Sequence, residues 1–156
     1  MMRRRTINHR RKLMYIDQIS VFMENKKGRL ASLTRTLAQN GIDLVALSIA
    51  DTADYGIMRA IVKDTAKAET VLRDAGFMVS KTEVLGVVVP DTPGGLADVL
   101  QIFTDGDISV EYLYSFVHTK GENALIMFKV DNCQSAEKLL KENSIELITR
   151  EQIGNM

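Results

Sequence analysis

The sequence predicts an α+β protein made of two tandem copies of one β-α-β-β-α-β unit, with antiparallel sheets and helices on one face. Three observations support this prediction: an internal repeat, strands with alternating apolar residues, and helices with apolar stripes. The composition agrees with it. Of the 156 residues, 46% are hydrophobic and 26% are charged, which is typical of a compact folded chain.

The repeat places Gly28 on Gly94 at an offset of 66 residues. Further along, Ala68–Leu72 falls on Ala136–Leu140 at an offset of 68, so the second copy holds two extra residues. We place these two residues in the turn-like stretch His118–Asn123. The resulting divisions are a basic arm outside the fold (1–17), a first unit (18–84) and a second unit (85–153).

In the first half of each unit, the sequence predicts a strand, a loop and a helix. Apolar residues alternate along Ile19–Met23, as in a strand with one buried face. After a glycine-containing loop, apolar residues recur at helical spacing. This stripe is Leu30, Leu33, Thr34 and Leu37 in the first copy, and Leu96, Val99, Leu100 and Phe103 in the second. We expect Asn40-Gly41 and Asp105-Gly106 to end the helices, because these residue types tolerate the left-handed conformation.

The second half of each unit predicts a hairpin, a helix and a closing strand. The hairpin strands are 42–51 with 56–63, and 108–118 with 123–131. Thr65 and Asn132 are suitable N-cap residues for the helices. The closing strands are 77–84 and 145–149.

This order is that of a ferredoxin-like unit, in which right-handed crossovers give the strand order 4-1-3-2. Leu85-Gly86 leads from one unit into the next without a linker. We therefore expect the two units to pack side by side with continuous sheets.

Charge is distributed unevenly along the chain. Residues 1–13 carry six basic residues and no acid, whereas the remaining residues have a net charge of −6. One interpretation of the arm is a tail that binds nucleic acid or an anionic surface. The other is an extension outside the fold, with Met14 as the natural start. We favour the extension, because basic arms that bind nucleic acid usually accompany a basic body.

Other features exclude whole classes of protein. No apolar run is long enough for a membrane helix, and the basic start lacks the apolar segment of a signal peptide. The single cysteine, Cys133, excludes an internal disulfide framework and favours a reducing compartment. We therefore expect a cytoplasmic protein with no membrane partner, no metal and no cofactor.

The repeated glycines suggest a ligand site. Gly28 and Gly94 each stand between a strand and a helix, where free backbone N–H groups and the helix dipole favour an anion. Asn25 and Asp91 precede them by three residues, and Asp43 and Ser109 begin the second strands. Free N–H groups beside an oxygen acceptor suit the carboxylate and ammonium of a free amino acid. The alternatives are glycines that only turn the chain and Asx-turns at Asn25 and Asp91.

The motif Asp91-Thr92-Pro93-Gly94-Gly95-Leu96-Ala97, together with Asn40-Gly41-Ile42-Asp43, resembles the ACT domain. The resemblance covers about residues 18–153. It implies a regulatory module whose units pair and bind small molecules, most often amino acids, at the interface between two units. The first copy has Lys27 where the family has proline, and the second has Asp107-Ile108-Ser109 where it has Gly-Ile-Asn. The resemblance therefore allows one occupied site or two.

By the same resemblance, the ligand would lie between a glycine loop and the second strand of a partner unit. Residues carried over to the loop walls are Asn25, Gly28, Arg29 and Leu30, and Asp91, Gly94, Gly95 and Leu96. Residues carried over to the strand walls are Leu47, Ser48 and Ile49, and Leu113, Tyr114 and Ser115. From the alternation of apolar residues we expect Tyr112 and Phe116 to pack in the core, and Tyr114 is a candidate side-chain contact.

Two rival functions are weaker. A hydrolase would need a base beside Cys133, but His9 lies in the arm and His118 at a hairpin end. An RNA-binding module would need aromatic residues on the middle strands and a basic sheet, and the acidic body has neither.

We therefore expect no enzyme and no nucleic-acid partner, but a homodimeric sensor of a free amino acid that acts on a metabolic enzyme in trans. The alternative is a ligand-free structural or dimerisation module, or a regulatory subunit of a metabolic enzyme.

Overall fold

The computed structural model describes residues 14–51, 53–120 and 122–156, which form two compact units. The N-terminal unit is residues 17–82. The C-terminal unit is residues 83–156 together with residues 14–16 from the start of the described chain. Helices and antiparallel strands occur in both units, so the predicted α+β fold class is confirmed.

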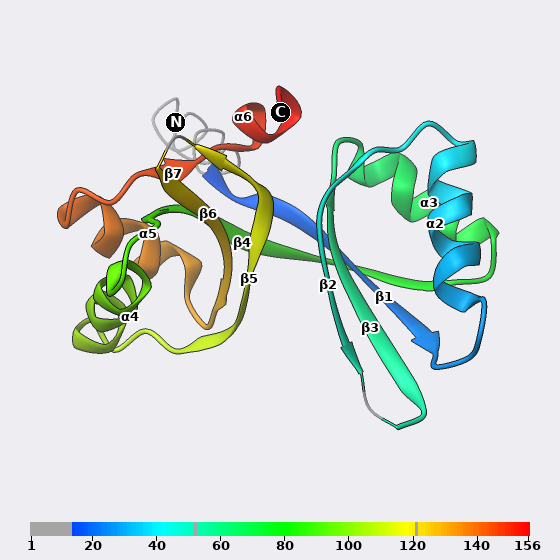
Figure 1. Cartoon of the computed structure of the whole chain (residues 1–156), viewed down its shortest axis with the longest axis horizontal. Coiled ribbons are helices and arrows are strands. Elements are labelled where there is room, and N and C mark those ends of the chain that lie inside the picture. Colours follow the sequence, from blue (N-terminus) through cyan, green and yellow to red (C-terminus); the bar gives the residue numbers. More distant parts are fainter. Residues whose placement is uncertain (1–13, 52, 121) are drawn as a thin grey trace, which may run out of the picture. The chain divides into compact units, whose positions relative to one another are not determined.

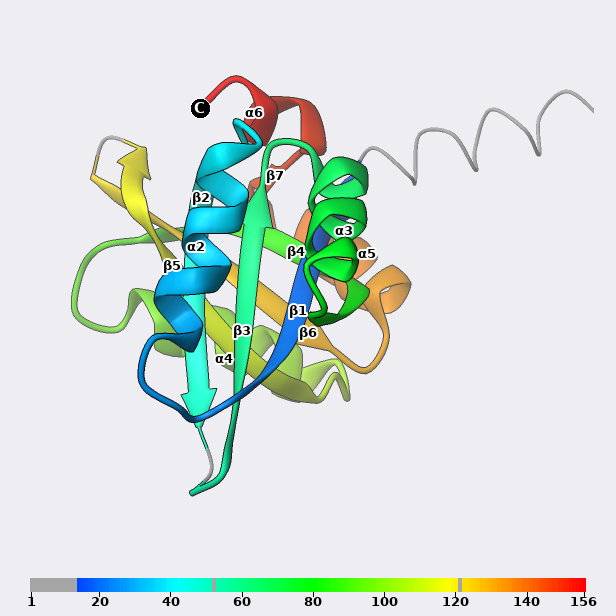
Figure 2. The same cartoon turned by 90° about the vertical axis from the view of Figure 1, so that its right-hand side faces the viewer.

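The N-terminal unit has the predicted element order. Its elements are β1 (Ile16–Glu24), α2 (Arg29–Gln39), β2 (Leu44–Asp51), β3 (Tyr55–Val62), α3 (Thr65–Asp74) and the first part of β4 (Met78–Pro90). The strands lie in the order β2-β3-β1-β4, which is the predicted 4-1-3-2 order. Both helices cover one face of this sheet, and Figure 2 looks onto that face with α2 and α3 in front of the strands.

The core of this unit lies between its helices and its sheet. Ile19 and Val21 of β1 are fully buried there, as the alternation predicts. Leu33 and Leu37 of α2 pack against them. Leu30, which the sequence places in the same stripe, lies in the first turn of α2 and is 39% exposed.

The C-terminal unit repeats this architecture and adds a short helix. Its elements are the rest of β4, α4 (Gly95–Asp105), β5 (Val110–Lys120), β6 (Asn123–Val130), α5 (Cys133–Glu142), β7 (Leu147–Ile148) and α6 (Arg150–Gly154). The strand order is β5-β6-β4-β7, again 4-1-3-2 (Figure 1). The closing strand β7 spans only two residues, whereas the sequence predicts five at 145–149.

The added helix, α6, begins where that predicted strand would end. The side chain of Thr149 accepts a hydrogen bond from the backbone N–H of Gln152, and the Gln152 side chain accepts one from the N–H of Thr149. This reciprocal capping box satisfies two backbone donors at once and ends the strand. Its Thr-x-x-Gln pattern is a local signal in the sequence, although a strand is predicted up to Thr149.

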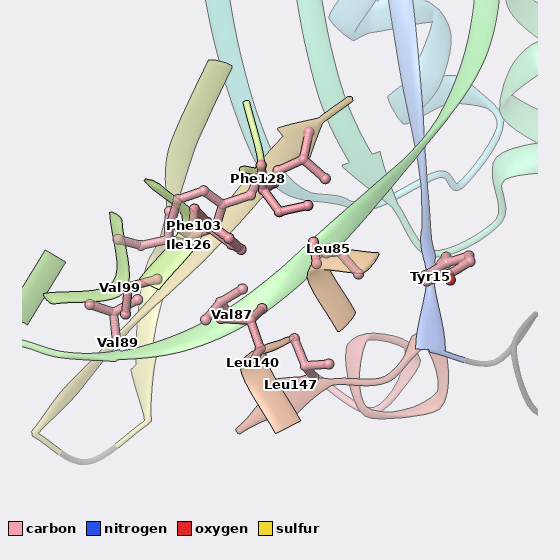
Figure 3. Close-up of a cluster of buried hydrophobic side chains, with 13 residues drawn as sticks. Tyr15, Leu85, Val87, Val89, Val99, Phe103, Ile126, Phe128, Leu140 and Leu147 are labelled. Carbon is pink, nitrogen blue, oxygen red and sulfur yellow. The ribbon is translucent and has the colours of Figure 1, made fainter. Parts of the chain in front are cut away.

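The core of the C-terminal unit includes the start of the described chain. Tyr15 belongs to the same buried cluster as Leu85 and Leu147 (Figure 3). Ile16 is 2% exposed, and the position that a Cβ on Gly86 would occupy is 2.6 Å from its Cδ1 atom. The sequence predicts an arm outside the fold over residues 1–17, which includes both of these residues. Here the structure differs, while residues 1–13 lie outside the described part of the chain.

Two helix ends also differ in detail from the expectation. Asp64, not Thr65, is the N-cap of α3, and its carboxylate accepts a hydrogen bond from the N–H of Lys67 at 3.0 Å. At the end of α4 the left-handed residue is Asp107, with a φ of 57°, whereas Gly106 has a φ of −90°. Asn132 is the N-cap of α5, as predicted.

Candidate functional site

The loops that join β1 to α2 and β4 to α4 have the same backbone. Gly28 has φ and ψ angles of 88° and −12°, and Gly94 has angles of 91° and −15°. These left-handed conformations strain residues with a Cβ, which explains why glycine occurs at both positions. The two halves of the chain therefore present the same loop.

Hydrogen bonds hold both loops against the hairpin of their own unit. The N–H of Asn25 donates to the carbonyl oxygen of Asp54 at 2.9 Å. In the C-terminal unit the N–H of Asp91 donates to the carbonyl oxygen of Glu122 at 3.1 Å. These hydrogen bonds therefore hold the loop before α2 and the loop before α4 beside the hairpin tip of the same unit.

The N-termini of α2 and α4 differ from those of the other helices described. Side chains cap α3, α5 and α6, whereas no side chain caps α2 or α4. Within the described part of the chain, no hydrogen bond is made by the N–H groups of Leu30 and Ala31, or by those of Leu96 and Ala97. Unpaired N–H groups at the positive end of a helix dipole form a site for an anion such as a carboxylate.

The predicted polar acceptors lie beside these N–H groups. Asn25 and Asp91 are exposed, and neither side chain makes a hydrogen bond or ion pair with the residues that the structure describes. The Asx-turn alternative is therefore not realised. Both side chains have free oxygen atoms that can accept from an ammonium group.

An open pocket of about 350 Å³ adjoins the N-terminal loop. It is lined by Glu24, Asn25, Lys26, Ala53, Asp54 and Tyr55. An ion pair of 2.5 Å joins Lys26 to Glu24, and this hydrogen bond and the lysine charge hold the pKa of Glu24 below its usual value. Each charge of this exposed pair therefore has an opposite charge beside it. That the hairpin residues Asp54 and Tyr55 line this pocket is not visible in the sequence, because only the fold brings them to the loop.

Arg29, predicted as part of the loop wall, lies elsewhere. Its guanidinium carbon is 4.5 Å from the centroid of the Phe77 ring, in a cation–π contact. Phe77 immediately precedes β4, on the other side of β1 from the hairpin strand β3. The aligned residue Gly95 has no room for a side chain, because a Cβ there would lie 2.1 Å from the carbonyl oxygen of Pro90.

Asp43 and Ser109, the other predicted acceptors, lie at the opposite end of each sheet from the loop of the same unit. Asp43 precedes Leu44, which pairs with Val62 at one end of the hairpin, while Asn25 adjoins the other end at Asp54. The length of β2, about 25 Å for its eight residues, separates the two positions. Asp43 instead forms an ion pair with Lys63, and the N–H of Ser109 donates to Asp131. One unit therefore cannot bring a loop and these acceptors to the same ligand.

The predicted strand walls lie on β2 and β5, each at one end of its unit's strand order. Leu47 and Ile49 are 45% and 41% exposed and Ser48 is partly exposed, so this edge carries accessible apolar side chains. On β5, Leu113 and Ser115 are exposed, but Tyr114 is only 7% exposed. Phe116 is buried as expected, and Tyr112 is partly buried.

Cys133, the nucleophile that a hydrolase would need, is partly buried at the start of α5. Burial raises the pKa of the Cys133 thiol, with Lys129 opposing and nearby glutamates adding to the effect, so the thiol stays protonated at neutral pH. No three metal-ligating side chains cluster in the part of the chain that was described. The side chains of His9 and His118 lie outside that part. None of the described helices has the length and apolarity needed to span a membrane.

Comparison with known proteins supplies an independent observation. A family model described as "ACT domain pair" matches residues 14–156. Protein BT0572 from Bacteroides thetaiotaomicron is 36% identical in sequence. The match covers 93% of this chain and 99% of that one, with a TM-score of 0.87. No curated protein matches the sequence.

Two further solved structures share the fold at lower identity. The regulatory subunit of aspartate kinase from Thermus flavus is 16% identical, with a TM-score of 0.58, and the match covers 83% of this chain and 92% of that one. The Thermus thermophilus regulatory subunit, in a ligand-free form, is 17% identical with the same TM-score, and covers 83% and 93%.

Proposed function

Because this chain belongs to the family of ACT domain pairs, we propose that it binds a free amino acid at the loops before α2 and α4 and acts as a regulatory sensor. Family membership supports a regulatory role, and the two loops suggest where the ligand binds. The observation that carries this proposal is the pair of uncapped helix N-termini, each with a free side-chain oxygen beside it.

The chemistry of the loops suits a zwitterion. The carboxylate of the amino acid would accept hydrogen bonds from the N–H groups of Leu30 and Ala31, or of Leu96 and Ala97. The ammonium would donate to the side-chain oxygen of Asn25 or Asp91. Each loop holds these groups in a backbone that is already ordered, which lowers the entropic cost of binding.

The second wall of the site stays a prediction from the resemblance. It would come from the second strand of another unit, through Leu47, Ser48 and Ile49 or through Leu113, Tyr114 and Ser115. The exposed side chains of Leu47 and Ile49 are consistent with such an edge, because β2 stands at the end of the strand order and apolar side chains on an edge strand favour association. The proposal includes a homodimer. It allows either one or two of the sites to be occupied.

Regulation would follow from linkage. A ligand that binds one arrangement of the protein stabilises it by RT ln(1 + [L]/Kd), about 2.7 kcal/mol at a hundredfold excess over Kd. A partner that contacts only that arrangement would respond to the ligand. Two structural neighbours are regulatory subunits of aspartate kinase, and we propose that this chain likewise acts on a metabolic enzyme in trans, without catalysis of its own.

A thermal-shift screen of the twenty amino acids on the full chain tests the proposal. We expect at least one amino acid to raise the melting temperature, and Gly28→Val or Asp91→Ala to weaken this shift. Gly41→Val is the matched control, because Gly41 also has a positive φ of 66° with open space around it, but lies at the end of α2. If no amino acid changes the melting temperature, the chain is a structural or dimerisation module and the sensor proposal is wrong.

A further inference from the structure

The turn that follows α2 contains the only Asn-Gly pair in the sequence, Asn40-Gly41. The side-chain amide of an asparagine can be attacked by the backbone nitrogen of the next residue. Glycine hinders this attack least, because it has no Cβ. The turn lies at the opposite end of α2 from the proposed ligand loop, so its chemistry is separate from ligand binding.

The reaction proceeds through a cyclic imide. The backbone nitrogen of Gly41 forms a bond to Cγ of Asn40, the Cγ–Nδ2 bond breaks, and the side-chain nitrogen leaves as ammonia with the proton that Gly41 loses. Water then adds to one of the two imide carbonyl carbons and opens the ring. The product is an aspartate, or an isoaspartate whose main chain runs through the former side chain. One ammonia is lost and one water is gained, and nothing is oxidised or reduced.

In the folded chain, the reacting groups are held apart by the turn. The Nδ2 group of Asn40 donates to the carbonyl oxygen of Thr36 at 2.8 Å, and the N–H of Gly41 donates to that of Ala38 at 3.0 Å. Ring closure requires the Gly41 nitrogen to eclipse Cβ of Asn40 about the Cα–C bond. The ψ angle of 10° at Asn40 places it close to the Asn40 nitrogen instead. The turn must therefore open before the ring can form.

The position of the turn favours local opening without loss of the core. Gly41 is exposed and Asn40 is partly exposed, and helix ends open at a lower free energy than core elements do. Ile42, which follows, is 6% exposed, and its N–H donates to the carbonyl oxygen of Leu37 at 3.0 Å. This anchor limits opening, so the rate of reaction should follow the small population of the open turn.

The C-terminal unit contains the same turn without the glycine. Asn143 ends α5 with φ and ψ angles of −95° and 13°, against −99° and 10° for Asn40. Its Nδ2 group donates to the carbonyl oxygen of Leu139 at 2.9 Å. Ser144 follows with a φ of 58°, against 66° for Gly41. The two asparagines therefore share one geometry and differ in the side chain of the next residue.

We propose that Asn40 is a site of spontaneous deamidation whose rate is controlled by opening of the turn at the end of α2. The new carboxylate cannot donate to the carbonyl oxygen of Thr36, and it faces the negative end of the helix dipole. Lys67, whose Nζ atom donates to the carbonyl oxygen of Asn40 at 2.6 Å, offsets only part of this repulsion. The modified turn therefore opens more readily, and the extent of modification records how often the turn has opened.

Peptide mapping of the full chain by mass spectrometry tests the proposal. One sample is incubated folded and another in guanidinium chloride at the same mildly alkaline pH, and deamidation at Asn40 and Asn143 is followed with time. In denaturant we expect Asn40 to react several-fold faster than Asn143. Folding should slow the reaction at Asn40 by about tenfold or more, because a closed turn reacts only through its open fraction.

Two reciprocal variants isolate the effect of the next residue. In denaturant, Gly41→Ser should slow Asn40 to the rate of Asn143, and Ser144→Gly should raise Asn143 to the rate of Asn40. An unchanged rate in either variant would show that Gly41 does not determine the reaction. Equal rates at Asn40 in the folded and unfolded chain would show that the turn does not control it. Either result would overturn the proposal, whether or not the chain binds an amino acid.

Discussion

Single residues in the two loops show that one residue type can be needed for different reasons. Gly94 has a positive φ of 91° and open space around it, so its requirement is conformational. Gly95 follows it with an ordinary φ, but the carbonyl oxygen of Pro90 occupies the place of a Cβ. The first requirement is local. The second depends on how closely β4 approaches the start of α4.

Gly95→Ala should destabilise the protein by about 3 kcal/mol, because the new methyl group meets backbone that cannot move aside like a flexible side chain. Gly94→Ala should cost less, about 1 kcal/mol, since it strains φ in open space. Urea unfolding of both variants measures the difference. Equal stabilities of the two variants would show that Pro90 does not constrain this position.

Among the elements, the helices divide into two groups by how they begin. Side chains cap the N-termini of α3, α5 and α6. The helices α2 and α4 begin at left-handed glycines without such a cap. Helix N-termini that lack a cap give up stability, and both of these helices stand beside the proposed ligand loops.

The cap of α3 provides a direct test of the element boundaries. Asp64→Ala should cost about 1 kcal/mol, because the N–H of Lys67 loses its acceptor. Thr65→Ala is the control, since Thr65 is the first helical residue and should change stability by only a few tenths of a kcal/mol. Chemical denaturation distinguishes the two. A larger loss for Thr65→Ala would place the cap one residue later.

For the whole molecule, the important feature is that the chain does not divide at a single point. Tyr15 and Ile16 belong to the C-terminal unit, residues 17–82 form the N-terminal unit, and the chain then returns to the C-terminal unit at residue 83. The strand β4 runs through that return without a linker. Each unit has its own buried cluster, so each has its own source of stability.

Removal of residues 1–16 should therefore destabilise the C-terminal unit, by about 4 kcal/mol for the loss of two buried side chains. Removal of residues 1–13 alone is the control, since it leaves Tyr15 and Ile16 in place. Hydrogen exchange at the amides of β6 and β7 reports on this unit. Increased exchange confined to residues 17–82 would contradict the assignment of the chain start to the C-terminal core.

The sequence by itself determined the duplicated β-α-β-β-α-β unit, the strand order and the two glycine loops. These features depend on local periodicity, on the left-handed conformation at Gly28 and Gly94, and on the constant handedness of crossovers, which act within short stretches of chain. The candidate loop residues Asn25, Gly28, Asp91 and Gly94 followed from the same local signals, whereas Arg29, Leu30, Gly95 and Leu96 came from the resemblance to the ACT domain. The capping box at Thr149 was equally local and could have been found.

Only the tertiary structure decided which residues meet through space. It stacked Arg29 on Phe77, placed Asp43 at the far end of the sheet, left Leu30 exposed and joined Tyr15 to the core of the more distant unit. None of these outcomes follows from periodicity, because each depends on a partner far away in the chain. Packing of a side chain is set by the surface that the rest of the fold presents to it.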